Sequence, residues 1–339
     1  MLSYYIRRPI AVTMGDPAGV GPEVTARAWA ARGENRLPPF VAIGDVAAIE
    51  AVWDGPVARV GDMDEVVKAF GEALPVWHLE DSGPLTPGSP TAAGATCALH
   101  ALETGIGLTR NQASSALVTG SVSKHALHGI GYTHPGQTEF IAERCGVTAT
   151  NAVMMLAAPG LRVVPLTVHI PLSEVAERLT SELIIAKGRI VARALRRDFG
   201  IEKPLLAVAG LNPHAGESGE MGDEELRIIR PAVEQLLADG IAVEGPLAAD
   251  SLFAPHVRTR YDALLCAYHD QALAPFKALH FDDGVNLTLG LPIVRTSPDH
   301  GTAFNIAGTG AADPGPTIAA IRMAAELAAM RERNCAPAA

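Results

Sequence analysis

Short apolar runs recur along the chain and alternate with stretches of helical periodicity. Eight runs have the length and aliphatic content of fully buried strands, at residues 10–14, 40–43, 116–119, 152–156, 163–168, 205–209, 263–268 and 285–289. Helical patterns separate most of them, at 22–31, 92–109, 138–145, 174–199, 223–238 and 317–333. This alternation predicts an α/β fold with a largely parallel sheet covered on both faces.

The length of 339 residues and the hydrophobic content of 48% provide enough material for two lobes. No repeat, low-complexity tract or composition shift marks a linker, so we expect the lobes to be interwoven. One would comprise about 1–130 plus 295–339, and the other about 131–294. Open α/β sheets place ligands at the carboxyl ends of their strands, so we expect a central cleft there.

The net charge of −10 limits the classes of molecule that the protein is expected to bind. No Lys/Arg run with interleaved aromatic residues occurs, which argues against nucleic acid and favours a small substrate. An anionic substrate would need local cations or a metal, because the overall field repels it. The four cysteines, at 97, 145, 266 and 335, share no short spacing and suggest reduced thiols. No stretch is long enough to span a membrane, so we expect a cytoplasmic protein.

Three histidines stand just after predicted strands. His169 lies in Thr-Val-His-Ile-Pro, His214 in Asn-Pro-His-Ala-Gly-Glu and His269 in Tyr-His-Asp-Gln. A single histidine is usually a surface or structural residue, but three at strand ends can converge on one divalent metal. Asp270 and Glu217 could add ligands or orient the rings. Nitrogen donors favour zinc or another borderline ion over calcium.

Polar residues also flank the apolar strand at 285–289. Lys277 and Asn286 lie near it, and Arg295 follows a Gly-Leu-Pro-Ile-Val run. Arg295 can clamp a carboxylate or phosphate with two parallel hydrogen bonds, although a structural ion pair is the simpler alternative.

Glycine-punctuated loops are further candidates for ligand contact. The loop 13–23 follows a strand and opens a helix, so it could cradle an anion or could simply form a tight turn. The loop 299–310 is rich in glycine and small polar residues, which permits close approach of the backbone to a flat ligand. The segment 119–124 suggests phosphate contact, yet Lys124 could equally be a solvated lysine at a helix start. No classical dinucleotide fingerprint occurs.

These motifs together resemble the 4-hydroxythreonine-4-phosphate dehydrogenase family of vitamin B6 biosynthesis. The resemblance covers almost the whole chain, through 13–23, 210–217, 267–271 and 295–310 in the family's order. It implies the isocitrate/isopropylmalate dehydrogenase-like fold, in which two α/β lobes share a sheet and bind a dinucleotide without the usual fingerprint. It also implies a homodimer with the site at the subunit interface.

The resemblance assigns roles residue by residue. His169, His214 and His269 match the metal ligands, the third reaching into the partner's site. The substrate-binding positions are Gln137, Thr138, Lys277, Asn286 and Arg295. The loop 299–310 resembles an adenosine-binding loop, which implies cofactor contacts from Asp299, Gly301, Thr302, Asn305 and Gly308. Two places depart from the family: Gln137 stands where a histidine is more usual, and Ser121 and Ser123 replace a more usual Pro and Asn.

The implied reaction is the oxidation of 4-phosphohydroxy-L-threonine by NAD or NADP, with loss of CO2 to give 3-amino-2-oxopropyl phosphate. A divalent metal (Zn, Mg or Co) would assist, and Lys277 and Asp270 are the catalytic candidates. A paralogous dehydrogenase of a four-carbon sugar-acid phosphate or a carboxylated dihydrodiol is the nearest alternative. An acyl or phosphoryl transferase, or a non-catalytic anion-binding protein, would leave the three histidines without a role.

Overall fold

The chain forms two compact units, each assembled from segments that are distant in sequence. The structure is a computed structural model that describes residues 6–79 and 82–335. The first unit comprises Met1–Ala149 and Leu291–Ala329, and the second comprises Thr150–Gly290 and Met330–Ala339. The first boundary places residues 131–149, including Gln137 and Thr138, in the first unit.

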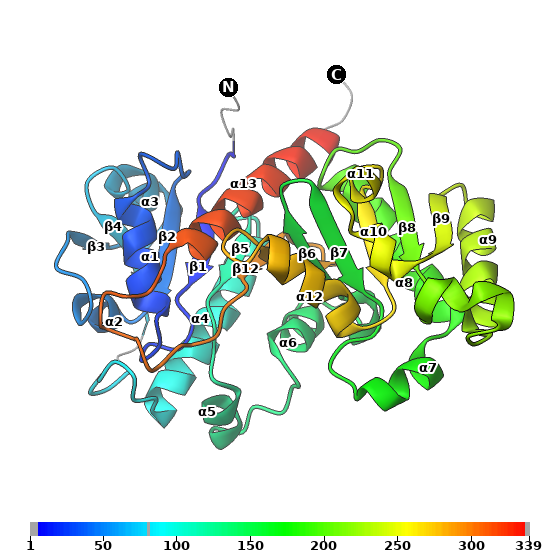
Figure 1. Ribbon diagram of the computed structural model, residues 1–339. Coiled ribbons are helices and arrows are strands. Elements are labelled where there is room, and N and C mark those ends of the chain that lie inside the picture. Colours follow the sequence, from blue (N-terminus) through cyan, green and yellow to red (C-terminus); the bar gives the residue numbers. More distant parts are fainter. Residues whose placement is uncertain (1–5, 80–81, 336–339) are drawn as a thin grey trace. The chain divides into compact units, whose positions relative to one another are not determined.

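The strands of the first unit are all parallel to their neighbours (Figure 1). Their spatial order is β3 (Val57–Arg59), β4 (Leu74–His78), β2 (Phe40–Gly44), β1 (Ile10–Thr13), β5 (Leu117–Thr119) and β12 (Arg295–Pro298). β1 and β2 are completely or almost completely buried, as their uninterrupted apolar sequences require.

Helices connect these parallel strands. They are α1 (Gly21–Ala30), α2 (Val46–Glu50), α3 (Met63–Ala69), α4 (Ala92–Arg110), α5 (Lys124–Gly129), α6 (Gln137–Arg144) and most of α13 (Gly315–Cys335). Gly105 lets α4 approach the sheet closely, because a Cβ there would lie 2.7 Å from the side chain of Leu117 and 3.0 Å from that of Thr13. Asp45, Asp62, Thr91 and Ser123 each cap the first turn of the helix that follows.

The second unit has mixed strand directions. Its order is β11 (Val285–Leu289), β6 (Val153–Ala158), β7 (Leu161–Pro165), β10 (Ala263–Cys266), β8 (Leu205–Ala209) and β9 (Ala242–Leu247). The pairs β11–β6 and β6–β7 are antiparallel, whereas β7, β10, β8 and β9 run parallel. The helices are α7 (Val175–Arg178), α8 (Ser181–Arg197), α9 (Arg230–Ala238), α10 (Ala249–Leu252), α11 (Pro255–Arg258) and α12 (His269–Leu279). Irregular turns occupy Ala149–Asn151, Leu172–Glu174, Pro213–Gly219 and Glu225–Ile229.

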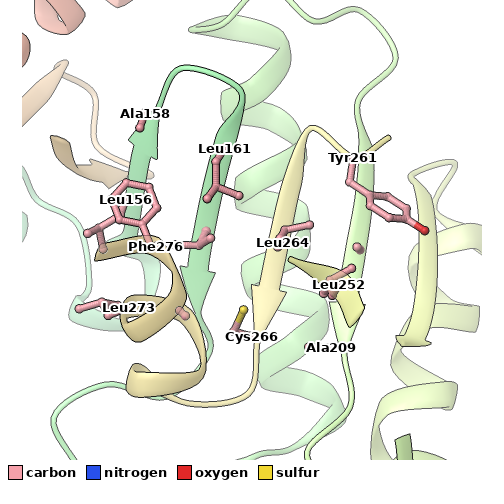
Figure 2. Close-up of a cluster of buried hydrophobic side chains, with 13 residues drawn as sticks. Leu156, Ala158, Leu161, Ala209, Leu252, Tyr261, Leu264, Cys266, Leu273 and Phe276 are labelled. Carbon is pink, nitrogen blue, oxygen red and sulfur yellow. The ribbon is translucent and has the colours of Figure 1, made fainter. Parts of the chain in front are cut away.

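One hydrophobic core of the second unit lies beneath α12. Leu273 and Phe276 are 6% and 0% exposed, and they project from the helix toward strand residues such as Leu156 (Figure 2). Leu264 and Cys266 of β10 belong to the same cluster. Fully burying one such side chain contributes about 1.5–3 kcal/mol. The core therefore fixes the helix that begins at His269.

The expected α/β fold is confirmed, with its eight predicted strands at or near the expected positions. Four strands, β3, β4, β9 and β12, lacked a clear signal because they are short or contain proline and polar residues. The expectation of one helix over 174–199 is wrong. Leu179 and Thr180 adopt extended conformations, and the Thr180 hydroxyl accepts a hydrogen bond from the N–H of Leu183 (3.2 Å), which starts α8 as a new helix.

Two further expectations concern the whole chain. Within the described residues, none of the helices combines the length and apolar character needed to cross a membrane. Cys97, Cys145 and Cys266 are buried thiols. The side chain of Cys335 lies outside the described part.

Candidate active site

The three candidate histidines follow neighbouring strands of the second unit. His169 comes after β7, His269 after β10 and His214 after β8. These strands are adjacent and parallel, because β10 pairs with β7 on one side and β8 on the other. Parallel strands end at one edge of a sheet, so all three histidine loops begin at that edge.

His169 and His269 lie side by side. Their ring centroids are 5.8 Å apart, with an angle of 42° between the rings. The Nδ1 of His269 is 2.6 Å from a carboxylate oxygen of Asp270, whose side chain is 81% exposed. A carboxylate beside one ring nitrogen is the usual arrangement behind a metal-ligating histidine.

The loop that carries His214 has an unusual backbone. His214, Ala215, Gly216, Glu217 and Ser218 are consecutive and all left-handed, with φ between 42° and 78°. A left-handed conformation costs a residue other than glycine about 1–2 kcal/mol. Four such residues within a run of five must be stabilised by their surroundings, and strain of this kind is concentrated at functional sites. His169 is also left-handed, with φ 53°.

Two side chains tie the three histidine loops together. The Thr167 hydroxyl donates to the Ala267 carbonyl (2.9 Å), joining the loops of His169 and His269. The Gln271 amide accepts from the Ala267 N–H (2.6 Å) and donates to the Gly210 carbonyl (2.8 Å), joining the loops of His269 and His214. The loops therefore form one hydrogen-bonded layer above the strand ends.

A buried carboxylate supports the His214 loop. Glu225 is 1% exposed and accepts hydrogen bonds from the Asn212 backbone (2.7 Å) and side chain (3.0 Å). A Cβ on Gly216 would lie 2.6 Å from a Glu225 oxygen, so only glycine permits this approach. Glu225 also opens the π-helical turn Glu225–Ile229, and such turns are frequent at functional sites.

The histidines satisfy part of what a metal site requires. The rings of His169 and His269 lie 5.8 Å apart after neighbouring strands. In the described part of the chain, however, no group of three or more His, Cys, Asp or Glu side chains is gathered so that it could hold a metal. His214 thus shares the sheet edge with the other two without joining them in a ready set of ligands.

Lys277 and Asn286 occupy other elements of the second unit. Lys277 lies in the last turn of α12, seven residues after Asp270, so the two share a side of the helix. The apolar side chains of Leu273 and Phe276 cover the strands from α12 (Figure 2). Asn286 is half-buried on β11, opposite Leu156 of β6.

Arg295 is the centre of a candidate anion-binding cluster in the first unit. The Arg295 side chain is buried, and its Nη2 donates to the Thr119 hydroxyl (2.6 Å). Burial lowers the pKa of Arg295 to about 10, while the negative charge of Glu139 opposes that shift. The guanidinium therefore stays charged at neutral pH, and it can bind a carboxylate or phosphate bidentately.

Gln137 and Thr138 form the first turn of α6 in the same unit. No side chain in the described residues caps this turn, and a helix N-terminus attracts anions. The Gln137 amide nitrogen donates to the Gly120 carbonyl (3.0 Å). That bond fixes the amide orientation, so the buried Oε1 faces the other way and receives no hydrogen bond from the described residues. Gln137 therefore offers an acceptor there, where a protonated histidine would offer a donor.

The three glycine-containing loops of the first unit pack against one another. Gly15 has φ 76°, and a Cβ there would overlap the Ser121 carbonyl. The Ser121 hydroxyl donates to the His300 carbonyl, and the Val20 N–H donates to the Thr302 carbonyl (3.0 Å). The loops 13–23, 119–124 and 299–310 therefore meet at one place. Buried Asp16 lies there too, and burial raises its pKa, although a hydrogen bond from Ala18 opposes the shift.

Helix α1 anchors the loop that we expect to contact the cofactor. The buried Glu23 carboxylate accepts from the Gly308 N–H (3.1 Å). Arg27 donates to the Gly310 carbonyl (2.9 Å) and to that of Ala312 (2.6 Å). Thr302 and Gly308 thus hold the loop through backbone hydrogen bonds, to Val20 and Glu23 respectively. Asp299 is half-buried, and Gly301 and Asn305 are exposed.

Several supporting residues carried no sequence signal of their own. Glu225 is an ordinary polar residue in the sequence, whereas Thr167 and Glu23 were visible only as members of longer motifs; their hydrogen bonds show what each holds. Gln271 was visible as part of a histidine motif but had no assigned role. A polar residue inside an apolar pattern, such as Glu225 in a helical stretch, is the one available hint.

Comparison with known proteins places the chain in a family. Residues 36–324 match the family described as pyridoxal phosphate biosynthetic protein PdxA. The 4-hydroxythreonine-4-phosphate dehydrogenase of Zymomonas mobilis is 53% identical, covering 96% of this chain and 97% of that protein. The crystal structure of the enzyme of that name from Klebsiella pneumoniae is similar with a TM-score of 0.83 and 35% identity, over 95% of this chain and 98% of that one. The crystal structure of a terephthalate 1,2-cis-dihydrodiol dehydrogenase from Burkholderia xenovorans is similar with a TM-score of 0.66 and 28% identity, over 94% of this chain and 98% of that one. The match over most of its length shows that the chain belongs to the PdxA family of pyridoxal phosphate biosynthetic proteins.

Proposed function

We propose that the chain is a cytoplasmic dehydrogenase that oxidises 4-phosphohydroxy-L-threonine with NAD or NADP. The alcohol becomes a ketone, the neighbouring carboxylate leaves as CO2, and the product is 3-amino-2-oxopropyl phosphate. The observation that carries the proposal is the set of histidines after β7, β10 and β8, with the rings of His169 and His269 5.8 Å apart, in a chain of this family.

The imidazole nitrogens at this edge of the second unit's sheet are donors that suit a divalent metal. His169, His214 and His269 would hold it, and imidazole donors favour zinc or cobalt over magnesium, which prefers oxygen. When bound, such an ion supplies a Lewis acid that favours deprotonation of an alcohol and withdraws electrons from a ketone. Asp270 supports this role by fixing the orientation of the His269 ring through its 2.6 Å contact.

The anion-binding cluster is assigned to the substrate's phosphate. Arg295 supplies a buried positive charge, and Thr138 supplies a hydroxyl and a backbone N–H at the start of α6. Asn286 can hydrogen-bond a polar group of the substrate from β11.

Lys277 is assigned to proton transfer or charge stabilisation near the reacting carbon. When bound, NAD or NADP accepts the hydride that leaves the alcohol carbon. The hydroxyl proton must go to a base, and the carbon that loses CO2 must regain a proton. An amine on the polar side of α12, together with Asp270, can serve these transfers. The cofactor is assigned to the loop 299–310, which Glu23 and Arg27 hold.

A homodimer is part of the proposal, with the site at the subunit interface. At the end of α12, the helix that begins with His269, Leu279 is 48% exposed and Phe281 is 76% exposed. Large apolar side chains exposed together suggest an interaction surface. Light scattering behind size-exclusion chromatography, on wild type and Phe281→Ser, tests this assembly.

Gln137 is the residue that favours the alternative function, that of a paralogous dehydrogenase. A paralogous dehydrogenase of a sugar-acid phosphate or a carboxylated dihydrodiol would share the metal and cofactor sites, and a dihydrodiol dehydrogenase is among the similar structures. The Gln137 Oε1 suits a substrate group that donates a hydrogen bond. Substrate profiling of wild type and Gln137→His separates these readings, because only the histidine can carry a charge to the phosphate.

The decisive experiment follows the absorbance of reduced nicotinamide with 4-phosphohydroxy-L-threonine. NAD and NADP are compared before and after chelation, and then after zinc, cobalt or magnesium is restored. Metal-dependent reduction establishes the activity. Activity that survives complete chelation overturns the metal assignment, and no reduction in metal-replete protein moves the function to the paralogues.

A further inference from the structure

The loop carrying His214 has no regular ladder to hold its shape. It follows β8 and runs through five left-handed residues before the π-helical turn Glu225–Ile229 begins. The Met221 N–H closes the loop by donating to the Gly216 carbonyl (3.2 Å). This bond alone does not connect the loop to the body of the unit.

Glu225 connects the loop at Asn212, in addition to the bond between Gln271 and Gly210. Its carboxylate receives the Asn212 N–H and the Asn212 side chain, at 2.7 and 3.0 Å, directly before the left-handed run. Gly216, in the middle of the run, packs against the same carboxylate. The loop is therefore wrapped around one buried acid, with its entry and its centre fixed to two oxygens.

We propose that Glu225 is the positioning residue of His214: it holds the left-handed loop in the one shape that presents this imidazole as a ligand. The inference rests on the proposed metal-dependent function. Glu225 itself is not a metal ligand here, because its oxygens are engaged with Asn212 and packed against Gly216.

The neighbouring Glu224 provides a matched control. It accepts a hydrogen bond from the same Asn212 side chain (2.7 Å) but not from the backbone, and it is less buried. Glu224→Ala removes one carboxylate from the same loop and leaves the backbone anchor. Glu225→Gln is the conservative variant, because its amide oxygen can still accept the Asn212 N–H while its charge is lost.

The test has two readouts that need no turnover. Cobalt titration, followed by calorimetry and visible absorption, measures metal affinity. Hydrogen exchange of the metal-free protein measures protection of the segment 210–222. We expect Glu225→Ala to bind cobalt roughly 10–100-fold more weakly, as is usual for loss of a group that supports a metal ligand, and to lose protection in this segment. Glu225→Gln should recover much of both, and Glu224→Ala should match wild type.

The outcomes separate failure of the inference from failure of the function. Cobalt affinity unchanged in a folded Glu225→Ala overturns the positioning role. If wild type binds no cobalt, the metal-dependent function fails, and the ligand-positioning role of Glu225 fails with it, whatever the exchange data show. If Glu225→Ala does not fold, Glu225→Gln decides: cobalt affinity and protection of 210–222 that both fall slightly support positioning, whereas cobalt affinity equal to wild type overturns it.

Discussion

The glycine loops of the first unit and the histidine loops of the second unit use the same region of backbone conformation in opposite ways. At Gly15, Gly308 and Gly310 the positive φ falls on glycine, which adopts it without strain, although Ala303 in the same loops also has a positive φ (44°). In the second unit it falls on His169 and on the run from His214, where most residues have a Cβ. The glycine loops of the first unit therefore pack closely with little backbone strain. The second maintains a strained shape and therefore depends on buried partners.

Removing the imidazole from the strained His214 loop should have the largest effect, and the effect should be on turnover. We expect His214→Ala to reduce turnover by at least a thousand-fold, on the order of 4 kcal/mol in the barrier, while circular dichroism and the melting temperature stay close to wild type. His256→Ala, an exposed histidine of the same unit, is the control. Normal turnover in the first variant would remove His214 from the site.

Adding a Cβ to the relaxed region should break its packing. In Gly15→Ala the new methyl group meets the Ser121 carbonyl at a positive φ, so we expect a loss of about 2–4 kcal/mol in the free energy of unfolding. Urea denaturation measures this. Gly33→Ala, where a Cβ meets nothing within 4 Å, should change stability little. Equal effects in the two variants would contradict the close approach of the loops.

The second unit also contains a buried charge. Lys187 is 8% exposed, it donates to the Pro165 carbonyl (3.3 Å), and burial lowers its pKa from 10.5 to about 8. Between these pH values the unfolded chain holds a proton that the folded chain releases. The free energy of unfolding should therefore rise as pH increases from 8 to 10.5, and the full cost of the buried charge applies below pH 8.

Lys187→Met should remove that cost. We expect the variant to be more stable than wild type at pH 7 by roughly 2–3 kcal/mol, with the difference shrinking toward pH 10. Denaturation at pH 7 and 9.5 compares the two proteins, and the exposed Lys203→Met serves as control. A variant less stable than wild type at pH 7 would show that the Pro165 hydrogen bond outweighs the buried charge.

Relaxing the strained region at an exposed position should have the smallest effect. Ser218 has φ 60° and is exposed, so Ser218→Gly relieves strain and loses little packing. We expect a gain of about 0.5–1 kcal/mol, reduced by the greater freedom of glycine in the unfolded chain. Ser89→Gly, at an exposed serine without positive φ, should instead destabilise slightly. The same sign for both changes, by thermal unfolding, would contradict the strain.

The sequence predicted the framework better than the support of the site. Buried strands such as β8 and β11 were located with their observed ends, because uninterrupted apolar runs leave few alternatives. β12 was missed, since Arg-Thr-Ser-Pro resembles a loop until neighbouring strands bury it. The histidines were visible through their place after strands, and the rings of His169 and His269 lie 5.8 Å apart, but their role as metal ligands stays a prediction.

What the sequence could not show are contacts between distant positions. Glu225 lies thirteen residues from the Asn212 backbone that it holds, and Glu23 lies 285 residues from the Gly308 N–H. No local pattern connects such pairs. The left-handed run was equally hidden, because only one of its five residues is glycine, the usual sign of that conformation.

The bonds made by Thr167 and Gln271 mean that the three histidine loops are not independent modules. The His169 loop donates to a carbonyl of the His269 segment, and the His269 segment donates to a carbonyl of the His214 loop. An engineer who transplants one loop from a distant relative must therefore bring both tying residues and their backbone partners with it. For the same reason, natural substitutions in any one loop should be accepted together with changes in the other two.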